Sequence, residues 1–176
     1  MNVFRTASTT LVALALSAAP LAAKPGHGPS ATARLFDPGG RDAGYAAVIV
    51  RKDKAVLRLS LTGMTPGAHG LHFHTTGKCK GDGFASAGGH LNPMGKMHGD
   101  LNPAGSHLGD LPNVTADVNG VTIAQIPLKG SAKALLAAIF DADGTAIVVH
   151  AGPDDYLTDP TGNSGGRIAC GVLQAK

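Results

Sequence analysis

The chain has 176 residues, enough for one domain with a sizeable core. Its 25 glycines, 4% aromatic residues and lack of tryptophan favour short strands and turns over long helices. The formal net charge of +3 comes from scattered basic residues, with no run longer than the pair Arg51 and Lys52, which argues against a nucleic-acid-binding protein.

Residues 1–23 are typical of a secretory signal peptide. Arg5 supplies a positive charge, residues 11–19 form an apolar run, and small residues precede a cleavage site after Ala23. The run is too short to span a bilayer, so we expect a periplasmic or secreted protein without membrane contact after cleavage; the alternative is a retained membrane anchor. We interpret residues 24–30 as a flexible linker and residues 31–176 as the folded domain.

Strand patterns fill the first part of this domain. Residues 31–36 form a short strand-like stretch, and turn-forming residues follow at 37–42. Residues 45–50 are mostly apolar and end in three β-branched side chains. Residues 55–61 place leucines on one face and polar side chains on the other, which predicts a half-buried strand. Residues 69–74 also have a strand-like pattern.

Four further strands are predicted at residues 113–118, 121–126, 146–150 and 167–173. Asn119 and Gly120 form a strong signal for a two-residue hairpin turn. Residues 131–140 indicate one helical turn or a loop, and residues 151–166 a polar loop. About eight short strands separated by turns predict an antiparallel sandwich or barrel.

Six of the eight histidines lie within residues 69–110, among glycines, prolines and asparagines rather than in a helical pattern: His69, His72, His74, His90, His98 and His107. Packing explains such a cluster poorly, whereas neutral imidazole is the commonest metal ligand in proteins. We therefore predict metal binding.

His72 and His74 are two residues apart in a strand-like stretch, so their rings project from the same face and can bind one metal. His150 ends another apolar strand and is a natural third ligand. A set of imidazoles without thiolate or carboxylate suits Cu(II).

The remaining candidates lie in long irregular loops, which a bound metal could order. His90 and His98 offer imidazole nitrogens there. His107 and Asp110, three residues apart, offer nitrogen and oxygen ligands that suit a closed tetrahedral zinc site.

The two cysteines, Cys79 and Cys170, are expected to form a disulfide in an exported protein. Closing so long a loop would stabilise the fold by ~4–5 kcal/mol through the entropy of the unfolded chain. The alternative is two free buried thiols.

Five motifs together resemble the copper/zinc superoxide dismutases, and the exported bacterial members most of all: GLHFHTTGKC, SAGGHLNPMGKMHG, SHLGDLPNVTAD, IVVH and GNSGGRIACGV. The resemblance runs from about Thr32 to Leu173. It implies an all-β fold: a Greek-key antiparallel β-sandwich or flattened barrel, immunoglobulin-like in architecture, with about eight strands and long metal-binding loops.

The resemblance implies two sets of ligands, copper at His72, His74, His90 and His150, and zinc at His90, His98, His107 and Asp110. His90 would bridge both metals as an imidazolate. Asp154 would link His72 to His98, and Cys79 and Cys170 would form the intrachain disulfide. His69 would be a structural residue beside the site.

The implied activity is that of an antioxidant oxidoreductase, a superoxide dismutase that converts superoxide to dioxygen and hydrogen peroxide. Arg167 would guide and hold the anionic substrate, and His90 would take up a proton during the copper cycle. The protein would act as a monomer or homodimer. Two departures stand out: Thr75 replaces an acid found in many members, and residues 156–166 contain no lysine and only Asp159 as an acid. Charged guidance of the substrate therefore depends mainly on Arg167.

Other metal proteins fit less well. A metallo-hydrolase would need aspartate and histidine where the chain has Thr76 and Gly77, and a cupin would need a glutamate ligand, although the chain has no glutamate. The serious alternative is an exported copper/zinc buffer or chaperone with the same fold. Such a protein would be expected to lose a copper ligand, the bridging histidine or Arg167, and all are present.

Overall fold

The computed structural model describes Met1 and residues 30–176; residues 2–29, nearly all of the predicted signal peptide and linker, lie outside the described residues. Within the described part, the strands are β1 Ala31–Phe36, β2 Asp42–Arg51, β3 Lys54–Leu61, β4 Gly67–His74, β5 Asp110–Ala116, β6 Thr122–Pro127, β7 Ala146–His150, β8 Arg167–Val172 and β9 Gln174–Ala175. The helices are the 3-10 segment η1 Asp82–Ala87 and the α-helix α1 Ala132–Ile139. The short β9 was not predicted.

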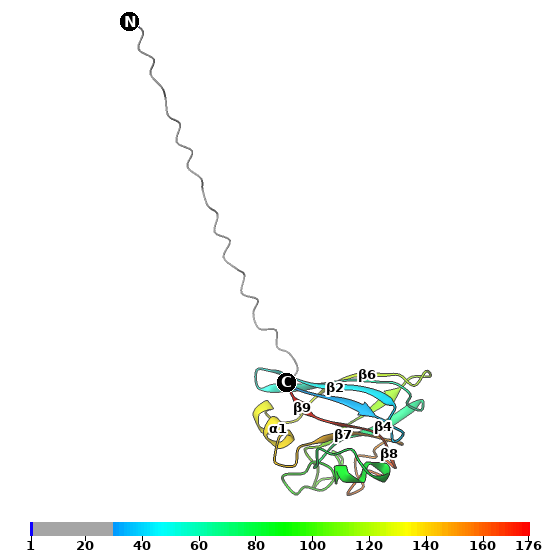
Figure 1. Ribbon diagram of the computed structural model, residues 1–176. Helices are drawn as coiled ribbons and strands as arrows, with labels where there is room; N and C mark the ends of the chain where they lie inside the picture. The colour runs from blue at the N-terminus through cyan, green and yellow to red at the C-terminus, as the bar shows by residue number, and fades with distance from the viewer. Residues whose placement is uncertain (2–29) are drawn as a thin grey trace.

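The strands form one antiparallel sheet in the order β5-β4-β7-β8-β1-β2-β3-β6, with β9 paired to β1. The neighbours β4 and β7, β8 and β1, and β3 and β6 are not consecutive in the chain, which is the crossover pattern of a Greek key. The end strands β5 and β6 contact each other, so the sheet nearly closes into a flattened barrel (Figure 1). The predicted all-β fold class is confirmed.

Side-chain alternation produces the barrel interior. In β3, Leu57, Leu59 and Leu61 are buried while Arg58 and Ser60 are exposed, as the alternating pattern predicts. These leucines join a single apolar cluster to which most strands and α1 contribute. Burying one face of each strand provides the main stabilisation of such a sheet.

The predicted two-residue hairpin at Asn119 and Gly120 is wrong. The chain does turn there, because the Gly120 N–H donates to the Asp117 carbonyl at 2.9 Å and Gly120 has a φ of 72°. However, β5 pairs with β4, and β6 pairs with β3. The turn therefore connects opposite ends of the sheet order rather than two paired strands, and β5 begins at Asp110 rather than at residue 113.

The uncertain segment 131–140 forms the eight-residue helix α1. The Ser131 hydroxyl accepts the N–H of Ala134 at 3.2 Å and so caps the first turn. Ala132, Leu135 and Ile139 share one face and are buried in the core. No helix in the described part is long and apolar enough to cross a membrane.

The outer face of β4, β7 and β8 is covered by two loops, residues 75–109 and 151–166 (Figure 1). Leu71 and Phe73 of β4 point into the core, so His72 and His74 project from the opposite, loop-covered face. The predicted disulfide is confirmed: Cys79 of the first loop is joined to Cys170 of β8, with an S–S distance of 2.01 Å.

A small apolar cluster seals the first loop onto this outer face. It consists of Phe84, Ala87, Ala146, Val148 and Cys170, with Cys79 packed against it. The loop is therefore held by a disulfide and by apolar packing beside the histidines.

Candidate metal centre

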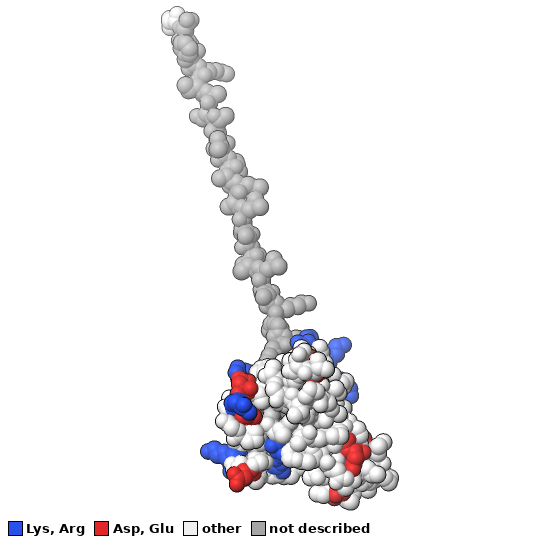
Figure 2. Space-filling model, turned by 90° about the vertical axis from the view of Figure 1, so that its right-hand side faces the viewer, with Lys and Arg blue, Asp and Glu red and all other residues white. Residues whose placement is uncertain are grey.

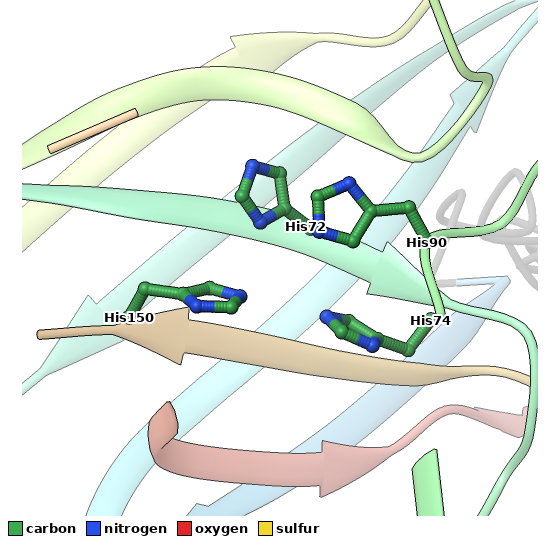
Figure 3. A group of neighbouring side chains, drawn as sticks. All are labelled: His72, His74, His90 and His150. Carbon is green, nitrogen blue, oxygen red and sulfur yellow. The ribbon is translucent and has the colours of Figure 1, made fainter. Parts of the chain in front are cut away.

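Four buried histidines converge on the loop-covered face; we call them the four-histidine group: His72, His74, His90 and His150. Each offers one ring nitrogen, and these nitrogens all lie within 4.8 Å of one another. The rings come from β4, from the end of β7 and from the first loop, and they point toward one another in Figure 3. The arrangement suits one metal ion bound by imidazoles.

Hydrogen bonds fix the orientation of three of these rings. The contacts are His72 Nε2 to Asp154 Oδ2 at 2.6 Å, His74 Nδ1 to the Gly88 carbonyl at 3.0 Å and His150 Nδ1 to the Gly165 carbonyl at 3.1 Å. Because each partner is an oxygen acceptor, each of these nitrogens carries the proton of a neutral ring. The lone pair of each ring is then on its other nitrogen.

Those other nitrogens have no hydrogen-bond partner within the described residues: His72 Nδ1, His74 Nε2 and His150 Nε2, and the same holds for His90 Nε2. A buried polar atom without a partner costs free energy. Several of them directed at one point fit a metal-binding site.

Burial also keeps the rings neutral. It lowers the pKa of His74 to about 2, of His150 to about 3 and of His90 to about 4. The neighbouring imidazoles and the cation of Arg167 act in the same direction on His74 and His150. Neutral imidazole is the form that binds a metal.

A second group shares His90 with the first; we call it the Asp110 group: His90, His98, His107 and Asp110. Oδ1 of Asp110 lies 3.0 Å from Nδ1 of His90 and 3.1 Å from Nδ1 of both His98 and His107. A tetrahedral zinc ion with bonds of 2.0–2.1 Å would separate its ligands by about 3.3 Å. The three distances from Asp110 are close to this spacing, so the Asp110 group is compatible with such an ion.

The electrostatics of the Asp110 group favour a cation. Burial alone would raise the pKa of Asp110, but contacts with His90 and His98 and the Gly99 N–H hold it well below its usual range. Burial opposes a charge on His98, yet the carboxylates of Asp110 and Asp154 outweigh it and raise the pKa of His98 to about 9. Without a metal, a proton on His98 therefore supplies the positive charge.

Asp154 joins the two groups. Its buried carboxylate accepts from His72 Nε2 through Oδ2 and lies 3.0 Å from His98 Nε2 through Oδ1. Burial would raise the pKa of Asp154, but these two histidines and the Tyr156 N–H hold it well below its usual range. A charged bridge thus spans the two groups.

Asn113 holds this bridge in place, and no sequence motif singled it out. Its side-chain amide donates to the Asp154 carbonyl and accepts the Asp154 N–H, both at 2.8 Å. Its own N–H donates to the Tyr156 hydroxyl at 2.7 Å. The Gly88 and Gly165 acceptors were missed for a different reason: they are backbone carbonyls, which every residue type provides.

Arg167 lies next to the four-histidine group, paired across the sheet with His150. Its guanidinium donates to the Phe84 carbonyl at 2.9 Å and to the Gly88 carbonyl at 2.6 Å. Burial lowers its pKa, but arginine remains a cation in proteins. The first loop therefore fixes a positive charge beside the four rings.

His69, the remaining histidine of the cluster, belongs to neither group. It is buried, and its Nδ1 lies 2.7 Å from the His150 carbonyl and its Nε2 2.8 Å from the Thr65 carbonyl. It contacts the backbone of β7 at His150, the residue whose ring belongs to the four-histidine group.

Residues 43–173 match the family model described as copper/zinc superoxide dismutase. A superoxide dismutase [Cu-Zn] of Caulobacter vibrioides is 43% identical over 151 residues, which cover 82% of this chain and 86% of that protein. Superoxide dismutase [Cu-Zn] 2 of Aquifex aeolicus is 41% identical over 147 residues, with the same coverage of 82% and 86%.

A solved structure supports the same assignment. The crystal structure of a superoxide-dismutase-like protein from Bacillus subtilis superposes with a TM-score of 0.74 at 35% identity, covering 85% of this chain and 99% of that one. The family model spans most of the chain, and both relatives exceed 40% identity. This chain belongs to the copper/zinc superoxide dismutase family.

Proposed function

We propose that this protein is a superoxide dismutase in which the four-histidine group binds copper and the Asp110 group binds zinc. The observation that carries the proposal is the sharing of His90: its Nε2 has no hydrogen-bond partner among the described residues and lies in the first group, and its Nδ1 faces Asp110 in the second. One imidazole can thus bridge two metals, as in an imidazolate. The donor sets agree with the preferences of copper for imidazole and of zinc for a closed tetrahedral site.

Bound copper would supply the one-electron cycle in which one superoxide is oxidised to dioxygen and a second, with two protons, is reduced to hydrogen peroxide. In this proposal His90 Nε2 holds and delivers one of these protons, while Nδ1 stays in the Asp110 group. His72, His74 and His150 keep their orientations throughout, because their second nitrogens are engaged by Asp154 and two carbonyls. Asp154 acts as the positioning carboxylate between the two sets of ligands.

Arg167 would bind the substrate anion. Its charge is fixed by two carbonyls of the first loop beside the four rings. On the face shown in Figure 2, basic and acidic groups are interspersed, with no large patch of one sign. In this proposal the local charge of Arg167 supplies the main attraction for superoxide at the four-histidine group.

We also propose export, with residues 1–23 as a cleaved signal peptide, 24–30 as a linker and 31–176 as the mature domain, active as a monomer or homodimer in the periplasm or outside the cell. The disulfide between Cys79 and Cys170 supports an oxidising compartment. The mass of the mature protein in fractionated cells tests cleavage after Ala23. Recovery of the uncleaved chain from membranes would contradict it.

The decisive experiment measures superoxide consumption by purified protein loaded with copper and zinc. We expect His150→Ala to lose copper and activity, and Arg167→Ala to keep both metals but lose activity about 10-fold or more at low superoxide. Arg58→Ala is the matched control, because Arg58 is an exposed arginine on the opposite part of the sheet. Two bound metals without turnover in the unmodified protein would instead identify a metal buffer or chaperone.

A further inference from the structure

The carboxylate of Asp159 reaches across from the loop of residues 151–166 to the Asp110 group. Its Oδ1 accepts the backbone N–H of His98 at 2.6 Å. The same oxygen lies 4.0 Å from Nε2 of His107. Its side chain is 34% exposed, whereas that of His107 is only 6% exposed, so the carboxylate stands at the edge of the buried group.

The second nitrogen of each histidine in the Asp110 group has a different environment. His90 Nε2 faces the four-histidine group, and His98 Nε2 lies 3.0 Å from Asp154. His107 Nδ1 faces Asp110, so a neutral His107 that gives Nδ1 to a metal carries its proton on Nε2. Within the described residues, Asp159 provides the carboxylate nearest to that N–H.

Metal-binding histidines almost always donate their second N–H to a carboxylate, a carbonyl or water, and the acceptor fixes the orientation of the ring. Asp154 serves His98 in this way. Asp159 stands in the corresponding place for His107, with its Oδ1 4.0 Å from Nε2 of that ring, and the same oxygen holds the backbone of His98.

We propose that Asp159 is a positioning residue for the metal of the Asp110 group, acting on His107 through the ring and on His98 through the backbone. It would add a connection between the loop that carries Asp154 and the loop that carries His98 and His107, beside the hydrogen bond from the Leu101 N–H to the Tyr156 carbonyl. The inference depends on the proposed function only in assigning zinc to the Asp110 group.

Asp155 provides a matched control from the same loop. Its carboxylate accepts from the backbone N–H groups of Leu157 and Thr158, and from the side chains of Thr158 and Asn163. It thus shapes the loop but contacts no histidine among the described hydrogen bonds and ion pairs. Asp155→Asn removes one charge from the loop, as Asp159→Asn does.

The experiment measures zinc affinity by chelator competition, and the visible absorption of Co²⁺ added at one equivalent, for full-length mature protein with the disulfide intact. We expect Asp159→Ala to weaken zinc binding about 10- to 100-fold and to change the Co²⁺ spectrum. Asp159→Asn keeps an oxygen for the His98 N–H but loses the charge, so its zinc affinity should lie between those of Asp159→Ala and the unmodified protein. Asp155→Asn should match the unmodified protein in both measurements.

Equal zinc affinity in Asp159→Ala and the unmodified protein would overturn the inference, as would an equal loss in Asp155→Asn. If Asp159→Ala does not fold, Asp159→Asn decides alone, and unchanged affinity and spectrum would reject the role. Failure of the proposed function would give a different result. The variants would differ in zinc affinity as expected, but the unmodified protein would not consume superoxide. The dismutase activity would then be rejected, and the role of Asp159 would stand.

Discussion

The two histidine groups are built on different supports. In the four-histidine group, His72 and His74 lie on β4 and His150 ends β7, and these strands pair with each other at His72 with Val148 and His74 with Ala146. In the Asp110 group, His98 and His107 lie in the irregular loop of residues 75–109. Only Asp110 belongs to a strand, as the first residue of β5.

This difference implies two ways of making a site. A strand pair fixes the positions of His72, His74 and His150 by its backbone hydrogen bonds, so these three rings can be placed without a metal, whereas His90 comes from the loop. The loop depends on Asp110 itself, whose Oδ2 accepts the N–H groups of Gly99 and His107 at 2.9 and 3.0 Å. The charges differ as well, because one group holds neutral rings and the other contains the carboxylate of Asp110, which favours a cation.

The largest effect is expected from removing the covalent tie of the loop. Cys79→Ser together with Cys170→Ser opens a disulfide that closes 91 residues, and we expect the metal-free protein to lose about 4–5 kcal/mol of its free energy of unfolding. Urea denaturation monitored by circular dichroism measures the free energy of unfolding. Adding reductant to the variant is the control, because without the disulfide its stability should not change. A loss below about 1 kcal/mol would mean that apolar packing alone holds the loop.

The strand-based group was largely predictable from the sequence. The spacing of His72 and His74 and the apolar run before His150 place three rings by the period of two, whatever the loops do. The hairpin at Asn119 and Gly120 failed because the turn residues specify a reversal but not the partner strand. That partner is set by the packing of the whole sheet.

The loop-based contacts could be predicted only in part. Asp154, Asp155 and Asp159 are the same residue type within one polar loop, and only the fold makes the first a bridge, the second a loop cap and the third a neighbour of His107. The resemblance to the family supplied Asp154. No local sequence pattern separates Asp155 from Asp159. The role of Asp159 depends on His98 and His107, about 50 or more positions away, and the role of Asp155 depends on the conformation of the loop itself.

A methyl group at Gly162 tests whether the Asp154 bridge couples the two groups. A side chain there would overlap Oδ1 of Asp154 and lie 2.6 Å from Nε2 of His98. We therefore expect Gly162→Ala to displace the bridge and to weaken both copper and zinc binding about 10-fold or more, measured by chelator competition for each metal.

Gly130→Ala is the control for backbone strain. Both glycines have a positive φ, 63° for Gly162 and 76° for Gly130, so both variants lose about 1–2 kcal/mol of stability. At Gly130, which is exposed in the loop before α1, no atom of the described residues beyond its chain neighbours lies within 4 Å of the added methyl. Unequal losses for the two metals in Gly162→Ala would show that the bridge serves one group only.

The smallest effect concerns the pH dependence of the metal-free protein, which should have opposite signs in the two groups. His150 has a folded pKa of about 3, below its unfolded value of 6.5, so the unfolded state binds the proton first as the pH falls. Stability is therefore lost between about pH 6.5 and 3. His98 has a folded pKa of about 9, above its unfolded value of 6.5, so its contribution to stability is complete below about pH 6.5 and is lost as the pH rises through 9.

Neutral substitutions separate the loss of stability at acidic pH from the loss at alkaline pH. His150→Gln should reduce the loss of unfolding free energy between pH 7 and pH 5 by about 2 kcal/mol, because one buried neutral ring is removed. His98→Gln should leave this loss at acidic pH in place and flatten the fall between pH 7 and pH 9 by a similar amount. Urea denaturation at pH 5, 7 and 9 in the presence of a chelator provides the values. If both variants changed the unfolding free energy over the same pH range, the protonation of the two groups would be linked. The electrostatic contrast between the strand-based and the loop-based group would then be wrong.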